Sequence, residues 1–327
     1  MSDQQDFQPD VNAATPSRLD QFVGQSTVVE QVRVALAACR NTGAAYPSSL
    51  FAGAPGLGKS QLVTIIAAEL GVPLRETLAQ TLATAGDLQA LLLDARDRDI
   101  VFLDEADELP PPLQTLLYRA LAERKLFVPR GRSGRHDVAL PLDAFTLILA
   151  TNHESRLQRP LVERFKIINR FEFYSHAEIE RLLRDRSAGL GWASDAEVFP
   201  LVAARSRGVP RVGLRLLEAV HRVAVSESEE RLTSIHVLRA CDIEGIDARG
   251  LDRTERDYLH ILAPEGSDVG PVRPGVIADR LGLPLRTLQA VIEPFLIRMD
   301  LISRSEQGRT LTPEGQRYVR GLREGAR

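Results

Sequence analysis

Three short apolar runs, each followed by glycine or polar residues, organise the first half of the chain. They cover residues 49–52, 99–103 and 145–152. Unbroken apolar runs of this length are typical of parallel strands that are buried on both faces. After the first run, residues 61–70 carry apolar side chains at helical spacing. The alternation of strand-like and helical patterns over residues 18–175 predicts an α/β fold, a doubly wound parallel sheet.

Helical patterns dominate the rest of the chain and divide it into two further predicted domains. Residues 176–248 predict an all-helical lid domain with helices at 177–188, 196–206, 212–226 and 234–241. Residues 249–327 predict a winged helix, with helices at 254–262, 276–281 and 285–299 and a wing hairpin at 301–304 and 309–311. The polar, acidic residues 1–17 predict a disordered tail.

Residues 53–60 read Gly-Ala-Pro-Gly-Leu-Gly-Lys-Ser and match the phosphate-binding loop G-x-x-x-x-G-K-[ST]. The glycines let backbone N–H groups curl around a phosphate, which larger side chains would obstruct. Lys59 then reaches the β- and γ-phosphates, and the Ser60 hydroxyl binds Mg²⁺. The plainer alternative is an ordinary glycine-rich turn between a strand and a helix. The agreement of loop, Lys, Ser and flanking elements favours ATP and Mg²⁺ as cofactors.

Polar residues follow the other two apolar runs and complete a hydrolytic site. Asp104 and Glu105 come after the second run, and Asn152 ends the third. We expect Asp104 to hold Mg²⁺, Glu105 to polarise the attacking water and Asn152 to orient that water. A solvated helix cap is the alternative for the two acidic residues. Ala106 and Asp107 complete the letters D-E-A-D, but the other motifs of the DEAD-box RNA helicases are absent.

Two arginines stand where the γ-phosphate of a nucleotide is commonly sensed. Arg164 precedes an apolar residue at a predicted helix end, which suits an arginine finger supplied in trans to another chain. Arg211 follows Gly-Val-Pro at the start of a helix, which suits a second sensor of the phosphates. Ordinary surface arginines are the alternative for both.

The order of these motifs is that of the AAA+ ATPases, and several segments are similar to the RuvB family, the motor ATPases of Holliday junction branch migration. The similarity covers residues 18–320. Besides the phosphate-binding loop, it is carried by Leu-Asp-Gln-Phe-Val-Gly-Gln at 19–25, Ala-Gly-Asp-Leu at 85–88, Arg-Phe-Glu-Phe-Tyr at 170–174, Arg-Ser-Arg-Gly-Val-Pro-Arg at 205–211, and Glu-Pro-Phe-Leu-Ile at 293–297.

The resemblance implies a ring-forming motor with a nucleotide site and with DNA contacts in the wing. Its DNA contacts fall on Arg304 and Arg309. It implies duplex DNA or a Holliday junction as substrate, a homohexamer, and a RuvA-like junction-binding partner. Departures from the family pattern occur at Thr15-Pro16, Gln61, Asp107, Asn152 and Gln307. The nucleotide contacts that it implies are Gly56, Leu57, Gly58, Lys59, Ser60, Gln61, Ala122, Glu123, Arg124, Tyr174, Arg211 and, in trans, Arg164.

The sequence of residues 126–140 does not decide which partner this segment contacts. Residues 126–140 have the pattern of strand, glycine turn and strand, and the resemblance implies that this hairpin docks on the RuvA-like partner through an apolar tip. Here the tip is basic, with Arg130, Arg132 and Arg135. Such a hairpin could instead touch DNA, or it could be a solvated loop.

Composition limits the class of function. The 327 residues are 44% hydrophobic and 26% charged, which is ordinary for a globular protein of two or three domains. The net charge of −3 gives no general attraction to DNA, so DNA binding has to come from local arginines. Cys39 and Cys241 lie in apolar helical contexts and are interpreted as core residues. No apolar run reaches about 18 residues, so we expect no membrane span and a cytoplasmic location.

Three functions are compatible with these patterns. The first is an ATP-driven ring motor on duplex DNA, of the Holliday junction branch migration type, acting in DNA recombination and repair. The second is an AAA+ loader or remodeller that acts on a protein and docks through its winged helix. The third is a DNA-binding regulator that does not translocate. The predicted finger Arg164 favours an oligomer, and the wing arginines favour DNA over a protein partner.

Overall fold

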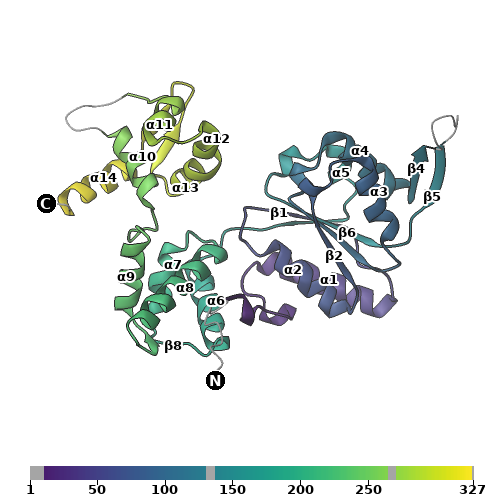
Figure 1. Ribbon diagram of the computed structural model, residues 1–327, viewed down its shortest axis with the longest axis horizontal. Helices are drawn as coiled ribbons and strands as arrows, with labels where there is room; N and C mark the ends of the chain where they lie inside the picture. Colours follow the sequence, from purple (N-terminus) through teal and green to yellow (C-terminus); the bar gives the residue numbers. More distant parts are fainter. Residues whose placement is uncertain (1–10, 130–136, 264–269, 326–327) are drawn as a thin grey trace, which may run out of the picture. The chain divides into compact units, whose positions relative to one another are not determined.

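The computed structural model describes residues 11–129, 137–263 and 270–325, and they form two compact units. The first unit contains the described residues up to Ala193 together with Gly208–Arg215. The second unit contains Ser194–Arg207 and the described residues from Leu216 onward. The elements of both units are labelled in Figure 1.

A five-stranded parallel sheet forms the centre of the first unit. Ala52 lies opposite Thr151 in the register of β1 and β6, and Leu103 lies opposite Leu149 in that of β3 and β6. The carboxyl ends of β1, β3 and β6 therefore meet at one edge, where parallel α/β folds bind ligands. In spatial order, the strands are Leu74–Leu78 (β2), Ile100–Asp104 (β3), Thr146–Thr151 (β6), Ser49–Ala52 (β1) and Ile167–Arg170 (β7).

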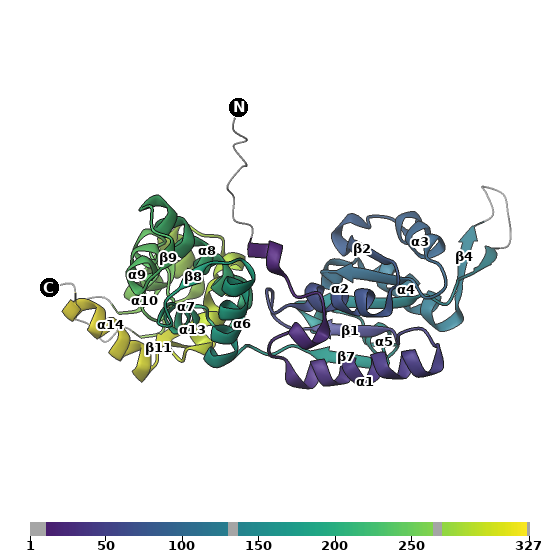
Figure 2. The same ribbon diagram turned by 90° about the horizontal axis from the view of Figure 1, so that it is seen from below.

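Helices cover both faces of this sheet. Figure 1 shows α1 (Ser26–Thr42) and α2 (Lys59–Leu70) on one face. The other face carries α3 (Ala85–Asp94), α4 (Pro111–Glu123) and α5 (Arg159–Val162). In Figure 2, α1 runs alongside the edge strand β7, which it contacts. The first unit is thus a three-layered doubly wound α/β domain, as the alternating patterns predict.

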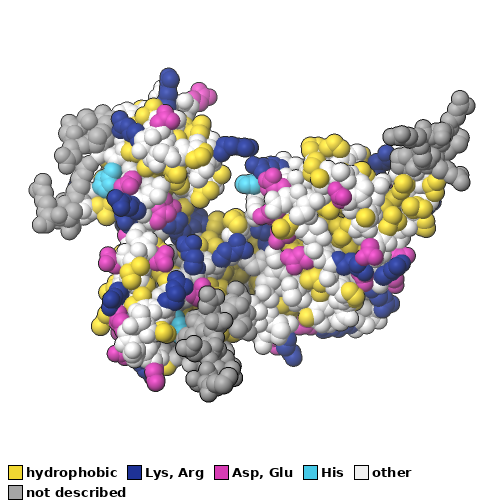
Figure 3. Space-filling model, viewed as in Figure 1, with side chains coloured by type: hydrophobic (Ala, Val, Ile, Leu, Met, Phe, Trp, Pro, Cys, Tyr) yellow, Lys and Arg dark blue, Asp and Glu magenta, His cyan; other side chains and the backbone are white. Residues whose placement is uncertain are grey.

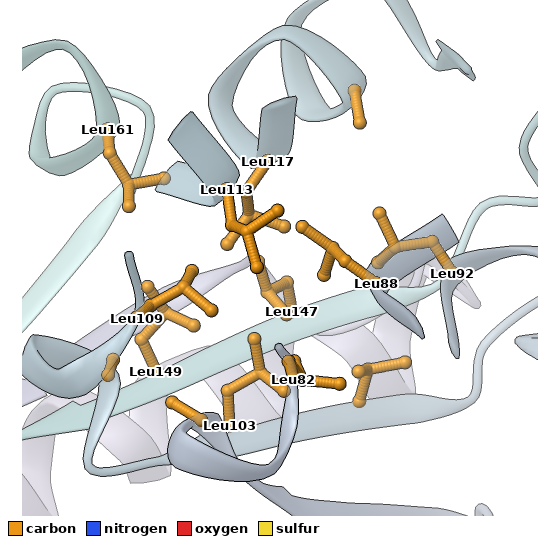
Figure 4. Close-up of a cluster of buried hydrophobic side chains, with 14 of the residues drawn as sticks. Leu82, Leu88, Leu92, Leu103, Leu109, Leu113, Leu117, Leu147, Leu149 and Leu161 are labelled. Atoms are coloured by element: carbon orange, nitrogen blue, oxygen red, sulfur yellow. The ribbon is translucent and has the colours of Figure 1, made fainter. Parts of the chain in front are cut away.

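A cluster of buried leucines holds the second helix layer on the sheet (Figure 4). Leu88 from α3 and Leu117 from α4 meet Leu103, Leu147 and Leu149 from the central strands, and all five are fully buried. Burial of one such side chain contributes roughly 1.5–3 kcal/mol. This packing fixes the helices that follow β2 and β3, and with them the edge of the sheet that carries the polar residues.

The structure confirms the strands that were predicted from apolar runs and adds two others. Strands β1, β3 and β6 and helix α2 lie where the patterns predict them, within one residue or two. The added strands are β2 and β7, the two edge strands. Their sequences, Leu-Arg-Glu-Thr-Leu and Ile-Ile-Asn-Arg, mix charged and polar residues with apolar ones because edge strands are only partly buried. They therefore lack the unbroken apolar run that marks a central strand.

The predicted lid helices are also present. Helix α6 (His176–Gly189) belongs to the first unit, and α7 (Val198–Arg205) and α9 (Ser234–Ile243) belong to the second. Helix α8 (Pro210–Ser226) begins in the first unit and continues into the second. Short elements complete this region and the first unit: β8 (Ala193–Ser194), β9 (Arg231–Leu232), and turns of 3-10 helix at Val11–Ala14, Leu19–Gln21, Ala79–Thr81, Ala106–Glu108 and Glu154–Arg156.

The C-terminal part of the second unit is a winged helix. Its recognition helix runs without a break through a π-helical turn that ends just before Glu293. Pro294 has no backbone N–H to donate, which suits this local change of helix type. The elements are α10 (Arg253–Leu262), α11 (Pro274–Leu281), α12 (Leu285–Thr287), the π turn (Leu288–Ile292), α13 (Glu293–Arg298), the wing strands β10 (Ile302–Arg304) and β11 (Arg309–Leu311), and α14 (Pro313–Gly325).

A second hairpin projects from the first unit. Strands β4 (Lys125–Pro129) and β5 (Asp137–Pro141) pair antiparallel, which confirms the two predicted strands. The predicted basic tip, with Arg130, Arg132 and Arg135, lies outside the described residues. Among the helices that the structure describes, none is both long and apolar enough to span a membrane.

Candidate nucleotide site and DNA-binding surface

The loop between β1 and α2 has the backbone geometry of a phosphate cradle. Gly56 and Gly58 take φ values of 80° and 96°, in the left-handed region that side chains disfavour. A Cβ atom on Gly56 would lie 2.9 Å from Cγ1 of Val209 and 3.0 Å from Cβ of Arg211. The loop leads directly into the N-terminus of α2, whose free N–H groups attract anions. Glycine is therefore required both for the turn and for the close approach of the lid segment.

Lys59 is a buried cation held by neutral acceptors. Its Nζ donates to the carbonyl oxygens of Gly53 (2.7 Å) and Ala54 (2.9 Å) and to Oδ1 of Asn152 (2.9 Å). Burial lowers the pKa of Lys59 to about 8, with the carboxylate of Asp104 opposing the shift. A buried ammonium without a paired carboxylate gains strongly from an incoming phosphate. The geometry thus matches the predicted role of Lys59.

The predicted metal ligands meet at the carboxyl edge of the sheet. The Ser60 hydroxyl donates to Oδ2 of Asp104 at 2.7 Å. A hydroxyl and a carboxylate are hard oxygen ligands of the kind that Mg²⁺ prefers, and Mg²⁺ takes its remaining ligands from water and phosphate. Within the described residues there is no group of three or more His, Cys, Asp or Glu side chains that could hold a metal alone. This donor set therefore fits a nucleotide-bound magnesium ion.

Glu105 occupies a special backbone position beside this pair. Its φ of 53° lies in the left-handed region, and its N–H donates to Oδ1 of Asp104 at 2.8 Å. Its side chain is partly buried at the end of β3. Non-glycine residues in this conformation concentrate at functional sites. The placement is that of a carboxylate next to the metal pair, as a water-polarising residue requires.

Asp107 has a positioning role that the sequence interpretation missed. It accepts hydrogen bonds from the Thr151 hydroxyl (2.8 Å) and from the backbone N–H of Asn152 (3.1 Å). These contacts fix the end of β6, so that Oδ1 of Asn152 meets Lys59. Arg156 lies 3.7 Å from the same carboxylate. Polar residues just past the ends of two neighbouring parallel strands were the available signal, since such ends meet at one edge.

The lid side of the loop brings together three more predicted residues. The Tyr174 hydroxyl donates to the carbonyl oxygen of Leu57 at 3.2 Å. The backbone N–H of Arg211 donates to the carbonyl oxygen of Gly56 at 3.4 Å. Nε2 of Gln61 donates to the carbonyl of Pro16 at 2.8 Å, which links α2 to the N-terminal segment. The Arg211 side chain is exposed and, in the part of the chain that the structure describes, forms no hydrogen bond or ion pair.

Four predicted nucleotide contacts lie at the opposite edge of the sheet. Arg124 follows α4 and donates to the carbonyl of Phe145, just before β6 begins. Ala122 and Glu123 precede it and are exposed. Arg164 lies three residues before the first residue of β7. The phosphate-binding loop follows the other end of β1, so these residues do not reach it within one chain. Residues 122–124 therefore lie away from the loop of their own chain, and the prediction is corrected to that extent.

The two wing arginines that were predicted to contact DNA differ in exposure. Arg304 is exposed, whereas Arg309 is only 5% exposed. Nε and Nη2 of Arg309 donate to the two carboxylate oxygens of Glu293 at 2.9 and 3.0 Å, and Glu293 is fully buried. The Tyr258 hydroxyl donates to the same carboxylate at 3.2 Å. The prediction that Arg309 binds a phosphate is therefore wrong, because its charge is already neutralised inside the domain.

Strand alternation alone does not explain why Arg309 points inward. Side chains alternate across a strand, so Arg309 shares a face with Leu311, and its cross-strand neighbour Arg304 shares that face with Ile302. Ile302 is buried in the core of the winged helix, and Leu311 packs against that core. Arg304 lies directly opposite Arg309 in the hairpin, so alternation gives both side chains the same face and does not distinguish them. The buried Glu293 carboxylate, which pairs with Arg309, is what holds the Arg309 side chain inside the domain.

Surface charge shows no extended basic region on the face drawn in Figure 3, where acidic and basic side chains are interspersed. This agrees with the net charge of −3. With no general attraction from the net charge, local cations such as the exposed Arg304 are the candidates for contact with DNA.

The phosphate-binding loop, the acidic end of β3 and the polar end of β6 on a parallel sheet, together with a C-terminal winged helix, define an ATPase of the AAA+ class that binds nucleotide at this loop. Two family models match the chain: the P-loop domain of the Holliday junction DNA helicase RuvB over residues 14–171, and the RuvB C-terminal winged helix domain over residues 248–320. The chain belongs to the RuvB family.

Curated relatives and solved structures agree with this assignment. The chain is 38% identical over 302 residues to the Holliday junction branch migration complex subunit RuvB of Streptomyces griseus, covering 92% of this chain and 83% of the relative. It is 38% identical over 306 residues to the protein of the same name from Paramagnetospirillum magneticum, covering 93% and 88%. A solved structure of the Thermotoga maritima RuvB Holliday junction branch migration motor superimposes with a TM-score of 0.81 at 30% identity, covering 94% and 98%.

Proposed function

We propose that this protein is an ATP-hydrolysing ring motor that moves duplex DNA, of the Holliday junction branch migration type. The observation that carries the proposal is the edge where β1, β3 and β6 end, at which Lys59, Ser60 and Asp104 lie together beside the phosphate-binding loop in a chain of the RuvB family. The relatives are named as subunits of the branch migration complex. Neither the protein remodeller nor the regulator gains a comparable supporting observation.

Each residue of the site has a separate task in ATP hydrolysis. Lys59 binds the β- and γ-phosphates, and Ser60 and Asp104 hold Mg²⁺, which neutralises phosphate charge when it is bound. Glu105 polarises the attacking water, and Asn152 orients it while it also positions Lys59. Arg211 approaches the phosphates from the lid side. The positions of Lys59, Ser60, Asp104 and Asn152 around the loop support these assignments.

A complete site requires two chains. Arg164 is exposed and, among the described residues, its guanidinium forms no hydrogen bond or ion pair, so its charge is available to a neighbour. Residues 122–124 lie at the same edge of the sheet and are supplied to the same neighbour. A head-to-tail contact of this kind closes into a ring when its rotation is a whole fraction of a turn. We infer a homohexamer, the ring that the family resemblance implies.

The finer assignments concern DNA and a partner protein. Arg304, at the end of β10, is placed to contact a backbone phosphate, a contact that is independent of base sequence and suits translocation. Phe127 and Val138, on the β4–β5 hairpin, are each 38% exposed and offer an apolar surface to a RuvA-like partner. We expect the work to take place in the cytoplasm, where ATP and bacterial chromosomal DNA are both available.

A branch migration assay tests the proposal directly. Purified protein with ATP and Mg²⁺ is incubated with a synthetic Holliday junction, with and without a RuvA protein, and separation of the junction into duplexes is measured. ATP-dependent separation is expected, and Glu105→Gln protein should bind ATP without separating the junction. Wild-type protein that hydrolyses ATP but moves no DNA under any of these conditions would exclude the motor.

A mixing experiment tests the shared site. Arg164→Ala protein should bind ATP normally but lose turnover by about 10³-fold, as arginine fingers do. Mixed with Glu105→Gln protein, it should regain part of the turnover, because sites in mixed rings combine an intact Glu105 with a neighbour's intact Arg164. If the ATPase activity of each mixture were only the sum of the activities of the two variants, this would count against a site built from two chains.

A further inference from the structure

One arginine, Arg207, just past the end of α7, makes several contacts with the winged helix. Its Nε donates to the carbonyl of Gly250 at 2.9 Å, and its two Nη atoms donate to the two carboxylate oxygens of Glu255 at 2.7 Å each. Its guanidinium also lies 4.3 Å from the ring centroid of Phe295 in α13. The lid, the segment before α10, α10 itself and the recognition helix therefore meet at one guanidinium.

This ion pair is buried and geometrically specific. The Glu255 side chain is 2% exposed and that of Arg207 is 20% exposed. Burial raises the pKa of Glu255 to about 7, against the opposing effect of Arg207. Glu255 also accepts from the backbone N–H of Asp252 at 2.9 Å, which fixes its carboxylate at the start of α10. A two-pronged pair of this kind holds one relative placement of its partners, unlike a flexible surface pair.

The backbone around Arg207 is equally constrained. Arg207 takes a left-handed φ of 58°, and its carbonyl accepts a hydrogen bond from the Arg298 guanidinium of α13. A Cβ atom on Gly250 would lie only 2.7 Å from the carbonyl oxygen of Arg205. The end of α7 and the start of the winged helix thus touch through backbone as well as through side chains, and the Arg207–Glu255 pair closes this contact.

The next residues in the chain belong to the nucleotide site. Gly208 accepts at its carbonyl from the N–H of Tyr174 at 2.9 Å, and Arg211 donates from its N–H to Gly56 of the phosphate-binding loop. Only three residues therefore lie between Arg207 and Arg211, the lid arginine near the phosphate-binding loop. This short covalent segment is the connection on which the following proposal rests.

We propose that Arg207 is a positioning residue that couples the winged helix to the nucleotide site, with its Glu255 ion pair as the rigid joint. The inference rests on the proposed motor function. Loss of the pair should leave ATP binding, basal hydrolysis and DNA binding in place and should remove the communication between them. Arg207 contacts neither nucleotide nor DNA in this role.

The test uses full-length Glu255→Gln protein, which keeps the shape of the side chain and removes its charge. We expect basal ATPase activity and duplex affinity within about twofold of wild type. The increase in ATPase activity at saturating duplex should fall at least fivefold, and more ATP should be consumed per base pair of migration. The double variant Arg207→Met/Glu255→Leu replaces the pair by apolar contacts, a change that commonly preserves folding, and it should show the same loss.

Glu293→Gln is the matched control. It breaks the other buried two-pronged pair of the second unit, Glu293–Arg309, which lies wholly inside the winged helix. It should destabilise the fold while DNA stimulation at saturating duplex is retained. Equal stimulation in wild-type and Glu255→Gln proteins would overturn the proposal. A parallel fall of basal activity, affinity and stimulation in Glu255→Gln would overturn it as well, because that pattern belongs to a merely structural role.

A distance measurement separates this inference from the proposed function. Spin labels are placed at two exposed positions of the second unit, Leu238→Cys in α9 and Arg320→Cys in α14, after the buried Cys39 and Cys241 are replaced by alanine. Without DNA or ATP, the distribution of label-to-label distances should be narrow in the protein that keeps Glu255. In the labelled Glu255→Gln variant, the width of this distribution should be at least twofold greater. An unchanged distribution refutes the joint even if the motor function stands. If the distance distribution broadens in the Glu255→Gln variant but the wild-type protein fails the branch migration assay, only the proposed motor function is refuted.

Discussion

The phosphate-binding loop and the wing each bury a cation, but they surround it with different partners. Lys59 is held by two backbone carbonyls and one amide oxygen, all of them neutral. Arg309 is held by both oxygens of the Glu293 carboxylate. Burial lowers the pKa of Lys59 to about 8, whereas the hydrogen bonds that Arg309 donates to Glu293 raise the pKa of Arg309. Lys59 therefore still needs an anion, and Arg309 already has one.

This difference separates a ligand site from a structural brace. A buried charge with only neutral partners is costly in the free protein and is stabilised when a phosphate arrives. A buried charge with a two-pronged carboxylate is already satisfied and holds its elements in place. Arg207, with Glu255 as its partner, is of the second kind. The charge of the partners thus indicates what a buried cation does, and five predictions follow from the comparison.

The largest expected effect is on folding of the wing. Arg309→Met leaves Glu293 buried without a cation, and breaking such a pair typically costs about 3–5 kcal/mol. We expect urea or thermal unfolding of the second unit to shift accordingly, with ATP affinity unchanged. The double variant Arg309→Met/Glu293→Leu should recover most of the lost stability. A single variant as stable as wild type would show that Arg309 is not a brace.

Lys59→Met should have the opposite profile. ATP affinity, measured by calorimetric titration, should fall at least about a hundredfold, because a charged hydrogen bond to phosphate is lost. The free energy of unfolding of the nucleotide-free protein should stay the same or rise, because a buried charge with neutral partners has been removed. A marked loss of stability together with normal ATP binding would make Lys59 a brace instead.

The lowered pKa of Lys59 predicts a pH dependence of ATP binding. Above about pH 8 the free protein has a neutral Lys59, so binding has to take up a proton. We expect ATP affinity to fall by up to about tenfold per pH unit as the pH rises above 8. Lys59→Met should lack this dependence, and an identical pH profile in both proteins would contradict the assignment.

The same group predicts the opposite trend for stability. Between about pH 8 and the ordinary lysine pKa of 10.5, the unfolded chain keeps the Lys59 proton and the folded protein releases it. The contribution of Lys59 to the free energy of unfolding should therefore increase with pH in that window. The difference between wild-type and Lys59→Met unfolding curves measures it.

The smallest expected effect concerns DNA. Arg304→Ala should lower the slope of log affinity for duplex against log salt by about 0.9, the value for one phosphate contact, equally for all sequences. Arg309→Lys keeps the buried positive charge and should leave the slope unchanged. Filter binding over a salt series measures both. A slope that responds to Arg309→Lys and not to Arg304→Ala would reverse our assignment of the two wing arginines.

Much of the nucleotide site could be predicted from local sequence. Residues 53–60 specify their own loop, because the glycines and the Lys-Ser pair act within one short segment. The unbroken apolar runs before Asp104 and Asn152 mark central strands, and the ends of neighbouring parallel strands meet by geometry. The winged helix could also be predicted from the sequence, including the two strands of its hairpin. In each case neighbours in sequence carry the information.

Only the tertiary structure decided what the polar residues meet across the fold. Asp107 positions the end of β6 because β6 lies beside β3. Residues 122–124 lie away from the loop because α4 runs the length of the sheet. Arg309 pairs with Glu293, sixteen positions away in the chain. The joint between Arg207 and Glu255 spans 48 positions. The sequence by itself determined the fold class and the chemistry of the loop, since these depend on local patterns. The role of each arginine depended on whether a distant carboxylate lies within hydrogen-bonding distance, which packing alone decides.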